Sequence, residues 1–371
     1  MTSTKQTIRV ALVGCGQIAD AHLGEIRKLS YAEVVGVCDL FEDLASQAAT
    51  RFNVAKTFTD MGTMFEAVKP DVVHITTPVH THAPLAIEAM RMGMNVYLEK
   101  PFSIDLAEAE TVFDVAEETG KRITVGHDQS FEPIWRECLD IANSGALGSV
   151  QHIDSILSYP IAGNFGRQVV GNPNHRVRRL PGGLFQNTIS HPLYRITDLM
   201  PDTSPDIWAK WFTKEPDIPF PTELRVHFLG NPISANLLFT STTRPSRIVR
   251  IYGEKDGLEV DLDIQTIQRM HNGSLPGAFQ KLQGPFIHFR EAARNLRRNI
   301  GKFARSEIHY FSGMTRLFDQ FYQSILNDTE LPISYDEIRR VTRFMDEIFA
   351  YCSANDNNIV KDENALEAVT V

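Results

Sequence analysis

Hydrophobic residues in the first third of the chain form short, β-branched runs separated by segments of helical period. These runs predict strands at 8–13, 33–38, 72–75, 95–98 and 123–125. In the segments between them, apolar residues recur every three or four positions, which predicts helices. Strands that alternate with helices form parallel sheets with helices on both faces. The first third of the chain is therefore predicted to be a doubly wound, Rossmann-type domain.

From about residue 149 the pattern changes to longer runs in which apolar and polar residues alternate. These runs predict strands at 149–157, 223–229, 233–239, 247–252 and 258–263. Alternation of period two is typical of an antiparallel sheet with one buried face. The predicted fold class is thus α/β, with a parallel Rossmann sheet first and an α+β domain with a large, mostly antiparallel sheet second.

The same patterns divide the chain into three parts. We expect a dinucleotide-binding domain at 1–128, a substrate-binding and oligomerisation domain at 129–352, and a polar tail at 353–371. The segment 159–183 is rich in Gly, Asn and Arg and has no clear period. Loops of that length in a compact domain are usually functional.

Composition narrows the class of protein. The 371 residues suffice for two domains, and the net charge of −9 argues against a protein that binds the phosphate backbone of nucleic acid. We find no apolar run long enough for an integral membrane span, and the start MTSTKQT lacks the features of a secretory signal. The four cysteines are scattered, with no metal-ligand spacing. We expect a cytoplasmic protein with no metal site.

The first predicted strand is followed directly by a G-x-G-x-x-A motif, Gly14 to Ala19. Gly14 permits a tight turn and Gly16 lets a pyrophosphate approach the helix N-terminus, beside Gln17 and Ile18. Asp39 ends the second strand, where a carboxylate accepts hydrogen bonds from the adenosine ribose and repels a 2′-phosphate. The motif therefore predicts NAD as cofactor rather than NADP.

Two further strands end in polar residues and proline. The strand 95–98 is followed by Glu99 and Lys100, and the strand 72–75 by Thr77, Pro78 and, four residues on, His82. Ligands of open α/β sheets bind at the carboxyl ends of the strands. We therefore place these residues in the cofactor site, with Lys100 as a candidate acid or base.

With these motifs and the run from Gly182-Gly183 to His191, the chain resembles the glucose-fructose oxidoreductase, inositol dehydrogenase and rhizopine catabolism (Gfo/Idh/MocA) family. The resemblance implies hydride transfer between nicotinamide C4 and a carbon of a sugar, cyclitol or sugar derivative. It also implies that Lys100 hydrogen-bonds the reacting oxygen and that His191 is a second acid or base. The i, i+4 spacing predicts Asn187 and His191 on one helix face.

This chain departs from the family pattern at one catalytic position. Asn187 stands where the family has Asp, and an amide neither transfers a proton nor carries a charge. Near the expected substrate pocket, His127 and Asp128 are candidate substrate contacts, although Asp128 equally suits a helix N-cap. Arg195, one turn beyond His191, is a further candidate for substrate binding.

Two basic segments of the chain lie outside these motifs. Arg178 and Arg179, in the long segment before Gly182, suit an anionic substrate such as a nucleotide-linked sugar or a uronic acid. A subunit contact or a solvated loop is the alternative. The segment 285–305 predicts a basic amphipathic helix, which either packs its apolar stripe on its own domain or contacts a membrane surface peripherally.

Three functions stay open at this point. The first is an NAD-dependent dehydrogenase or reductase acting on CH–OH groups of sugar-like molecules. The second is a redox-neutral, NAD-using epimerase or glycosidase-type enzyme. The third is a catalytically silent NAD-binding scaffold. For each we expect a homodimer or homotetramer.

Overall fold

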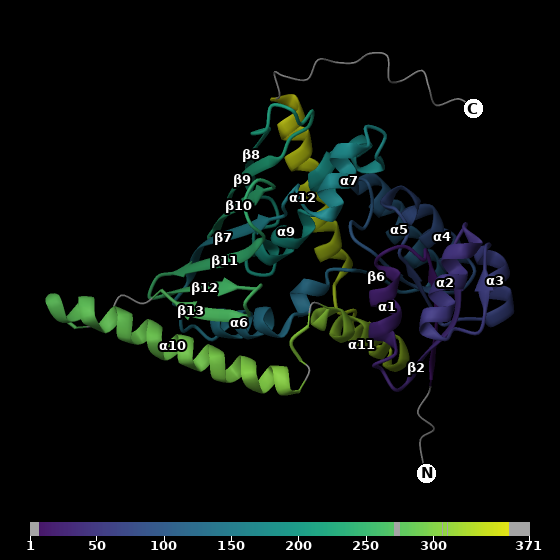
Figure 1. Ribbon diagram of the computed structural model, residues 1–371, viewed down its shortest axis with the longest axis horizontal. Coiled ribbons are helices and arrows are strands. Elements are labelled where there is room, and N and C mark those ends of the chain that lie inside the picture. The colour runs from purple at the N-terminus through teal and green to yellow at the C-terminus, as the bar shows by residue number, and fades with distance from the viewer. Residues whose placement is uncertain (1–6, 271–274, 306, 310, 356–371) are drawn as a thin grey trace, which may run out of the picture.

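The computed structural model describes residues 7–270, 275–305, 307–309 and 311–355 (Figure 1). The predicted tail from 353 lies, beyond Asn355, outside the described residues. The first domain has a six-stranded parallel sheet of order β3-β2-β1-β4-β5-β6. Its strands are β1 (Ile8–Val13), β2 (Ala32–Cys38), β3 (Thr57–Phe58), β4 (Val72–Ile75), β5 (Asn95–Leu98) and β6 (Ile123–Val125).

Five helices connect these strands and cover the sheet. They are α1 (Ala19–Ile26), α2 (Glu42–Phe52), α3 (Met61–Val68), α4 (His82–Arg91) and α5 (Leu106–Thr119). Both faces of the sheet are covered, so the inner strands β1 and β4 are almost wholly buried.

The second domain is built on a seven-stranded sheet of order β13-β12-β11-β7-β10-β9-β8. Its strands are β7 (Val150–Ser158), β8 (Asp206–Phe212), β9 (Glu223–Leu229), β10 (Ser234–Thr240), β11 (Ser246–Gly253), β12 (Gly257–Asp261) and β13 (Thr266–Arg269). All neighbouring pairs are antiparallel except β7 and β10, which are parallel. The predicted fold class is confirmed.

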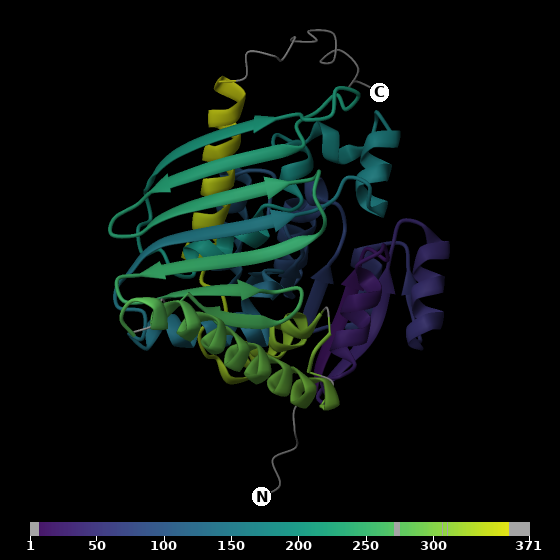
Figure 2. The same cartoon turned by 60° about the vertical axis from the view of Figure 1, so that its left-hand side comes forward.

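The remaining helices cover one face of this sheet or join the domains. They are α6 (Pro133–Asn143), α7 (Asn164–Gly171), α8 (Gly183–Gln186), α9 (Ser190–Thr197), α10 (Ala278–Ala304), α11 (Ser312–Asn327) and α12 (Tyr335–Ala354). The other face is open and turns toward the viewer in Figure 2, with α10 along its border. α7 lies inside the segment 159–183, so this segment is not the continuous loop that its composition indicated. It is anchored by Val169, which is fully buried.

α11 packs on the first domain although it follows the second in sequence. Leu317, Phe318, Phe321 and Tyr322 belong to the same core as β1, β4 and β5. α12 divides its contacts, because Ile338 joins this core while its later apolar residues join the core of the second domain. The C-terminal helices therefore tie the two cores together.

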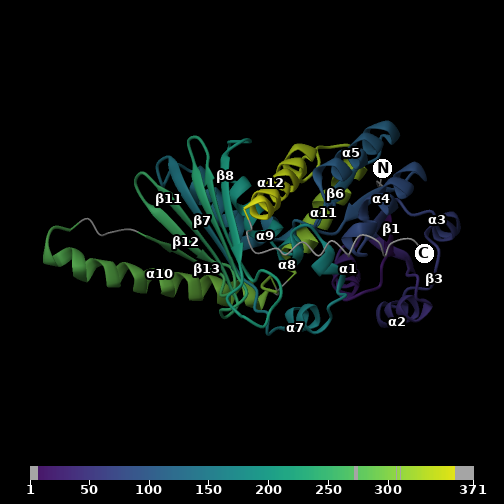
Figure 3. The same cartoon turned by 90° about the horizontal axis from the view of Figure 1, so that it is seen from above.

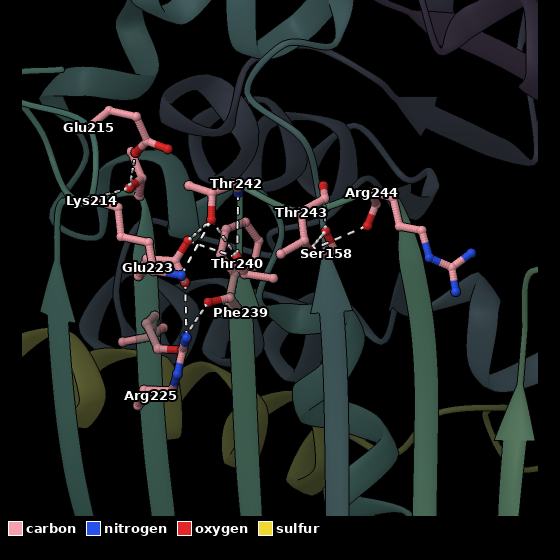
Figure 4. Close-up of polar contacts among 12 residues, drawn as sticks. Ser158, Lys214, Glu215, Glu223, Arg225, Phe239, Thr240, Thr242, Thr243 and Arg244 are labelled. Carbon is pink, nitrogen blue, oxygen red and sulfur yellow. Dashed lines mark hydrogen bonds and ion pairs between the residues drawn. The ribbon is translucent and has the colours of Figure 1, made fainter. Parts of the chain in front are cut away.

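At one end of the second sheet a buried carboxylate organises the strand ends (Figure 4). Glu223 is 0% exposed and accepts hydrogen bonds from Thr240 at 2.7 Å and Thr242 at 2.9 Å. Its other oxygen pairs with Arg225 at 2.9 Å and Lys214 at 3.5 Å. Burial acts to raise the pKa of Glu223, but these partners outweigh it and the pKa is lowered. The carboxylate is fully partnered and ties the loop before β9 to β10.

Candidate active site

A tight turn between β1 and α1 holds the glycines of the dinucleotide motif. Gly14 has a φ of +98°, and a Cβ on it would lie 2.8 Å from Cγ2 of Thr77. At Gly16 the surroundings are open, because a Cβ there would meet no atom within 4 Å. Gln17 and Ile18 complete the turn before α1 begins. The fold thus requires glycine at position 14, whereas the space at position 16 fits a pyrophosphate at the helix N-terminus.

The carboxylate of Asp39 fastens this turn to the end of β2. One oxygen accepts a hydrogen bond from the backbone N–H of Cys15 at 2.7 Å, and the other from that of Phe41 at 2.9 Å. Each carboxylate oxygen has the capacity for a second hydrogen bond, which leaves acceptors for ribose hydroxyls. Leu40 and Phe41, which follow, are apolar and exposed. The strand end therefore fits the adenosine ribose of NAD.

His82, at the start of α4, bridges the ends of β4 and β5. Its Nε2 lies 2.8 Å from the carbonyl oxygen of Thr77 and its Nδ1 2.9 Å from that of Pro101. The neutral ring donates to one of them, and only the protonated ring donates to both. Burial lowers the pKa of His82, and the two carbonyls offset part of this effect. His82 thereby holds Thr77-Pro78 and Lys100-Pro101 at one edge of the sheet.

Lys100 reaches from the end of β5 across to the second domain. Its ammonium nitrogen donates a hydrogen bond to the backbone oxygen of Asn187 at 3.0 Å. A small pocket between the domains, next to Lys100, is lined by Pro101, His127, Gln186 and Ser190 among others. The two motifs predicted to be catalytic, distant in sequence, thus meet between the domains.

The carbonyl of Asn187 is free for Lys100 because the helix breaks there. The structure replaces the single predicted helix by α8 and α9 with a turn at 187–189, so Asn187 and His191 do not share one continuous helix. In this turn the N–H of His191 bonds to the carbonyl of Thr188 at 3.3 Å instead of that of Asn187.

His191 is held by a tyrosine that the sequence analysis did not single out. Its Nδ1 lies 2.8 Å from the hydroxyl of Tyr194, whose ring is 4.7 Å from that of His127. Burial, together with the positive charges of Lys100 and Arg195, holds the pKa of His191 well below its usual value. Burial lowers the pKa of His127 to about 3. Both imidazoles are therefore neutral at pH 7, and His191 keeps Nε2 for a further hydrogen bond.

Asp128 begins a short 3-10 helix, Asp128–Phe131, at the carboxyl end of β6. Burial, together with the negative charges of Glu99 and Glu132, raises the pKa of Asp128 to about 7, against the opposing charge of Lys100. Burial therefore shifts the pKa of the Asp128 carboxyl toward neutrality.

Glu99 faces inward and starts a buried chain of hydrogen bonds. Its Oε1 lies 2.9 Å from Nε2 of His22 on α1, and Nδ1 of His22 lies 2.8 Å from Nδ1 of His74 on β4. Nε2 of His74 lies 2.7 Å from the hydroxyl of Tyr322 on α11. Burial acts to raise the pKa of Glu99, but the hydrogen bond and charge of His22 and the charge of Lys100 outweigh it and the pKa is lowered. The residue before Lys100 is thus an anchored carboxylate.

Residues 8–127 match the family described as oxidoreductases with an NAD-binding Rossmann fold, Gfo/Idh/MocA. The first domain is therefore a Rossmann domain of the Gfo/Idh/MocA type. The resemblance inferred from the motifs is confirmed, and the first domain is an NAD-binding domain whose glycine turn and Asp39 fit that cofactor.

Relatives of this chain include D-glucoside 3-dehydrogenase of Escherichia coli, 30% identical over 40% of this chain and 42% of the relative. Glycosyl hydrolase family 109 protein 1 of Akkermansia muciniphila is 26% identical over 42% of this chain and 34% of the relative. The matches span less than half of each relative's length. The solved WlbA dehydrogenase of Bordetella pertussis, in complex with NADH and UDP-GlcNAcA, has the same fold. Its TM-score is 0.76 at 18% identity, over 95% of this chain and 98% of that one.

The candidate substrate-binding arginines have other contacts than Lys100. Arg195 is 0% exposed and donates to the side-chain oxygen of Gln129. Arg178 stacks on the ring of Phe220 with its guanidinium carbon 5.1 Å from the ring centroid, and Arg179 is exposed. Within the described part of the chain, no hydrogen bond or ion pair joins any of the three to Lys100 or His191, and their role in substrate binding stays a prediction.

The described residues contain neither a candidate metal-binding cluster nor a candidate membrane span. Among those that the structure describes, no group of three or more His, Cys, Asp or Glu side chains is arranged to hold a metal ion. No described helix has both the length and the apolar character needed to cross a bilayer.

Proposed function

We propose that this protein is an NAD-dependent oxidoreductase that transfers a hydride between nicotinamide C4 and a hydroxyl or keto carbon of a sugar, cyclitol or sugar derivative. The observation that carries the proposal is the meeting of Lys100 and the Asn187–His191 segment between the domains. A lysine at a strand end beside the cofactor domain and a neutral histidine opposite it suit proton transfer to and from a substrate oxygen. The sugar dehydrogenase among the relatives supports the substrate class.

Each residue of the site has a distinct task in this proposal. NAD, when bound, supplies the hydride acceptor. The ammonium group of Lys100 donates a hydrogen bond to the reacting oxygen of the substrate, which takes the place of the Asn187 carbonyl. In the reduction direction the ammonium group gives this oxygen a proton, and in the oxidation direction the neutral amine takes the hydroxyl proton. His191 orients a neighbouring hydroxyl through Nε2, because Tyr194 fixes the ring through Nδ1. Glu99 positions Lys100 by accepting a hydrogen bond from its backbone N–H at 3.1 Å.

The test is a panel of sugars, cyclitols and uronic acids with NAD, followed as absorbance at 340 nm. We expect turnover with at least one of them. Lys100→Ala should lower kcat by about 10²–10⁴-fold while NAD affinity stays within a few fold, since general acid–base groups contribute on that scale. Lys121→Ala, at the opposite end of β6, is the matched control. Full activity of Lys100→Ala would refute the assignment.

A redox-neutral reaction is the second candidate, and the glycosyl hydrolase among the relatives favours it. In such a reaction the hydride removed from the sugar returns to it after elimination or epimerisation. Product would then form with catalytic NAD and without net change at 340 nm. A sustained rise at 340 nm that is stoichiometric with product would exclude it.

Arg178 and Arg179 support a narrower proposal, an anionic sugar or a nucleotide sugar as substrate. They lie on the segment that leads into α8, whose C-terminus holds Asn187. Arg178→Gln with Arg179→Gln should raise KM for uronic acids or nucleotide sugars and leave KM for neutral sugars unchanged. An equal KM for all substrates would remove this proposal.

We also propose that copies of the chain associate through the open face of the second sheet. Across it run paired residues Trp208, His227, Asn236 and Asp154, and Trp208 is 61% exposed. Light scattering should give a dimer or tetramer that Trp208→Ser with Leu229→Ser weakens. A wild-type monomer at micromolar concentration would contradict this.

A further inference from the structure

Helix α10 lies along the β13 edge of the second sheet, and its N-terminal part extends past the sheet (Figures 1 and 3). It has 27 residues, among the longest helices described in this chain. It contains six Lys and Arg but only one acidic residue, Glu291, in a chain of net charge −9. The helix is therefore a local basic element on an acidic protein.

The side of α10 that faces its own domain is polar. The side-chain amide of Asn295 donates to the carbonyl of Ile267 on β13 at 2.9 Å and accepts from its N–H at 3.3 Å. Glu291 accepts from the backbone N–H of Arg269 at 3.1 Å. These contacts satisfy the backbone groups that an edge strand otherwise leaves unpaired. They also fix the rotation of the helix about its axis.

Ion pairs hold the C-terminal half in the same orientation. Arg298 pairs with Glu137 on α6 at 2.9 Å and donates to the carbonyl of Gln265 at 2.7 Å. Lys302 pairs with the same Glu137 at 3.5 Å. The two cations on this side are thus paired with a carboxylate of the same domain.

The opposite side carries an apolar stripe that faces solvent. We define the apolar stripe as Phe279, Leu282, Phe286, Phe289, Leu296, Ile300 and Phe303, each 60–75% exposed. The spacing of three and four residues keeps them on one face along the whole helix. Of the two alternatives in the sequence, packing of this stripe on its own domain is therefore wrong, because polar residues take that place.

The size of the stripe is unusual for a soluble surface. Since a large aromatic side chain has roughly 150–250 Å² of surface, seven large side chains that are more than half exposed present on the order of 800 Å². The largest apolar patch of a monomeric protein is usually about 300–600 Å², and larger ones mark interaction sites.

Unpaired cations border the stripe. Arg290, Arg294 and Arg297 project beside it on one flank and Lys281 on the other, all exposed. No carboxylate among the described residues forms an ion pair with these four. The guanidinium of Arg290 lies 6.0 Å from the centroid of the Phe286 ring. An apolar face bordered by cations matches the acyl and headgroup layers of an anionic bilayer.

We propose that α10 is a peripheral anchor that lies in the interface of an anionic membrane, with the apolar stripe among the acyl chains and Arg290, Arg294, Arg297 and Lys281 at the phosphates. Pairing of α10 with a second copy is disfavoured by charge. An antiparallel pair would place the arginines of the two helices beside each other, and a parallel pair would place them beside the Lys281 flank, which carries no carboxylate. The proposal does not depend on the reaction that the protein performs.

Vesicle flotation of the full chain tests this proposal. We expect binding to vesicles of phosphatidylcholine with phosphatidylglycerol, and little binding to phosphatidylcholine alone. Binding should fall steeply between low salt and 1 M salt, where the Debye length is about 3 Å. A Phe289→Trp variant should show a blue shift of tryptophan emission with the anionic vesicles only.

Two variants separate the contributions of the stripe and the cations. Phe286→Ser with Phe289→Ser should abolish flotation. Arg290→Gln with Arg294→Gln and Arg297→Gln should weaken it on the order of a hundredfold, at about fivefold for each cation. All five positions are exposed, so the melting temperature should not change. Met92→Ser with Tyr351→Ser, at exposed apolar positions outside both the stripe and the open sheet face, is the matched control and should float like the wild type.

Two outcomes would overturn the proposal. One is the absence of flotation of the wild type with anionic vesicles at low salt. The other is a stripe variant that still floats but changes the oligomeric state in light scattering, which would assign the stripe to contact between copies. Sugar turnover measured in the same preparations reports on the proposed function separately.

Discussion

The ammonium group of Lys100 and the backbone oxygen of Asn187 form a hydrogen bond across the two domains. The bond exists because a turn between α8 and α9 withdraws the Asn187 carbonyl from the helix. The carbonyl marks a position for an acceptor oxygen beside Lys100. A substrate hydroxyl oxygen in this position accepts a hydrogen bond from the ammonium group of Lys100, which is the proton donor of the pair.

Asn187→Asp restores the residue typical of the family and tests whether its absence matters. A carboxylate here should raise the pKa of His191, because it opposes the positive charges that now lower it. Imidazole NMR measures this pKa. We expect kcat/KM to change less than tenfold. A gain of more than a hundredfold from an inactive wild type would instead identify a silent scaffold.

Gly16→Ala should affect NAD binding, whereas Gly14→Ala should affect the stability of the fold. At position 16 the new methyl group has space, so the melting temperature should stay unchanged while the Kd for NAD rises at least tenfold. At position 14 the positive φ and the contact with Thr77 should destabilise the protein itself. Calorimetry of binding and thermal unfolding distinguish the two. An unchanged NAD affinity in Gly16→Ala would contradict the pyrophosphate position.

Asp39→Asn should lower the preference for NAD over NADP. The wild type should bind NAD at least tenfold more tightly, because the carboxylate repels a 2′-phosphate. The amide removes this repulsion, so the Kd for NADP should fall. Asp43→Asn, an exposed position on α2, is the control. If Asp39→Asn prefers NAD over NADP as strongly as the wild type does, the ribose binds away from Asp39.

Asp128→Asn should stabilise the protein increasingly as the pH rises. The pKa of Asp128 is about 7 in the folded state and about 3.9 in an unfolded chain. Between these values the folded state binds more protons, so its stability falls as the pH rises. The variant lacks this loss and should gain roughly 1–3 kcal/mol at pH 8 and little near pH 4.5. Urea unfolding at both values measures it, and a constant difference would refute the raised pKa.

Tyr322→Phe should cost about 1–3 kcal/mol of unfolding free energy, since it leaves Nε2 of the fully buried His74 without a partner. Combined with His74→Phe, its cost should be less than additive. Tyr351→Phe on the surface of α12 should cost less than about 0.5 kcal/mol. Additive effects would show that the buried chain is not energetically coupled.

The cofactor-binding residues could be predicted from the sequence because the motifs that identify them are local. The turn at Gly14 and the strand ends at Asp39 and Lys100 depend on neighbours within a few residues, and β1, β4, β5 and β6 have the predicted bounds. The two-residue β3 is too short for any period. Tyr194 had a weak signal, its position three residues after His191 on a helix.

The pairing of distant segments was outside the reach of periodicity. The period of an amphipathic helix states which face is apolar but not what covers it. Periodicity therefore did not show that α11 completes the first core or that His22 and His74 meet, and it left open whether the apolar stripe of α10 faces its own domain or faces outward. In each case the deciding contact joins residues far apart in the chain.

The position of α11 also affects how the protein is made. The Rossmann core, although encoded first, lacks Leu317, Phe318 and Phe321 until the ribosome has translated past the whole second sheet. Domains encoded first often fold first during synthesis. We therefore expect the cofactor domain to complete its core only late in synthesis, together with the docking of α12, whose Ile338 belongs to the same core.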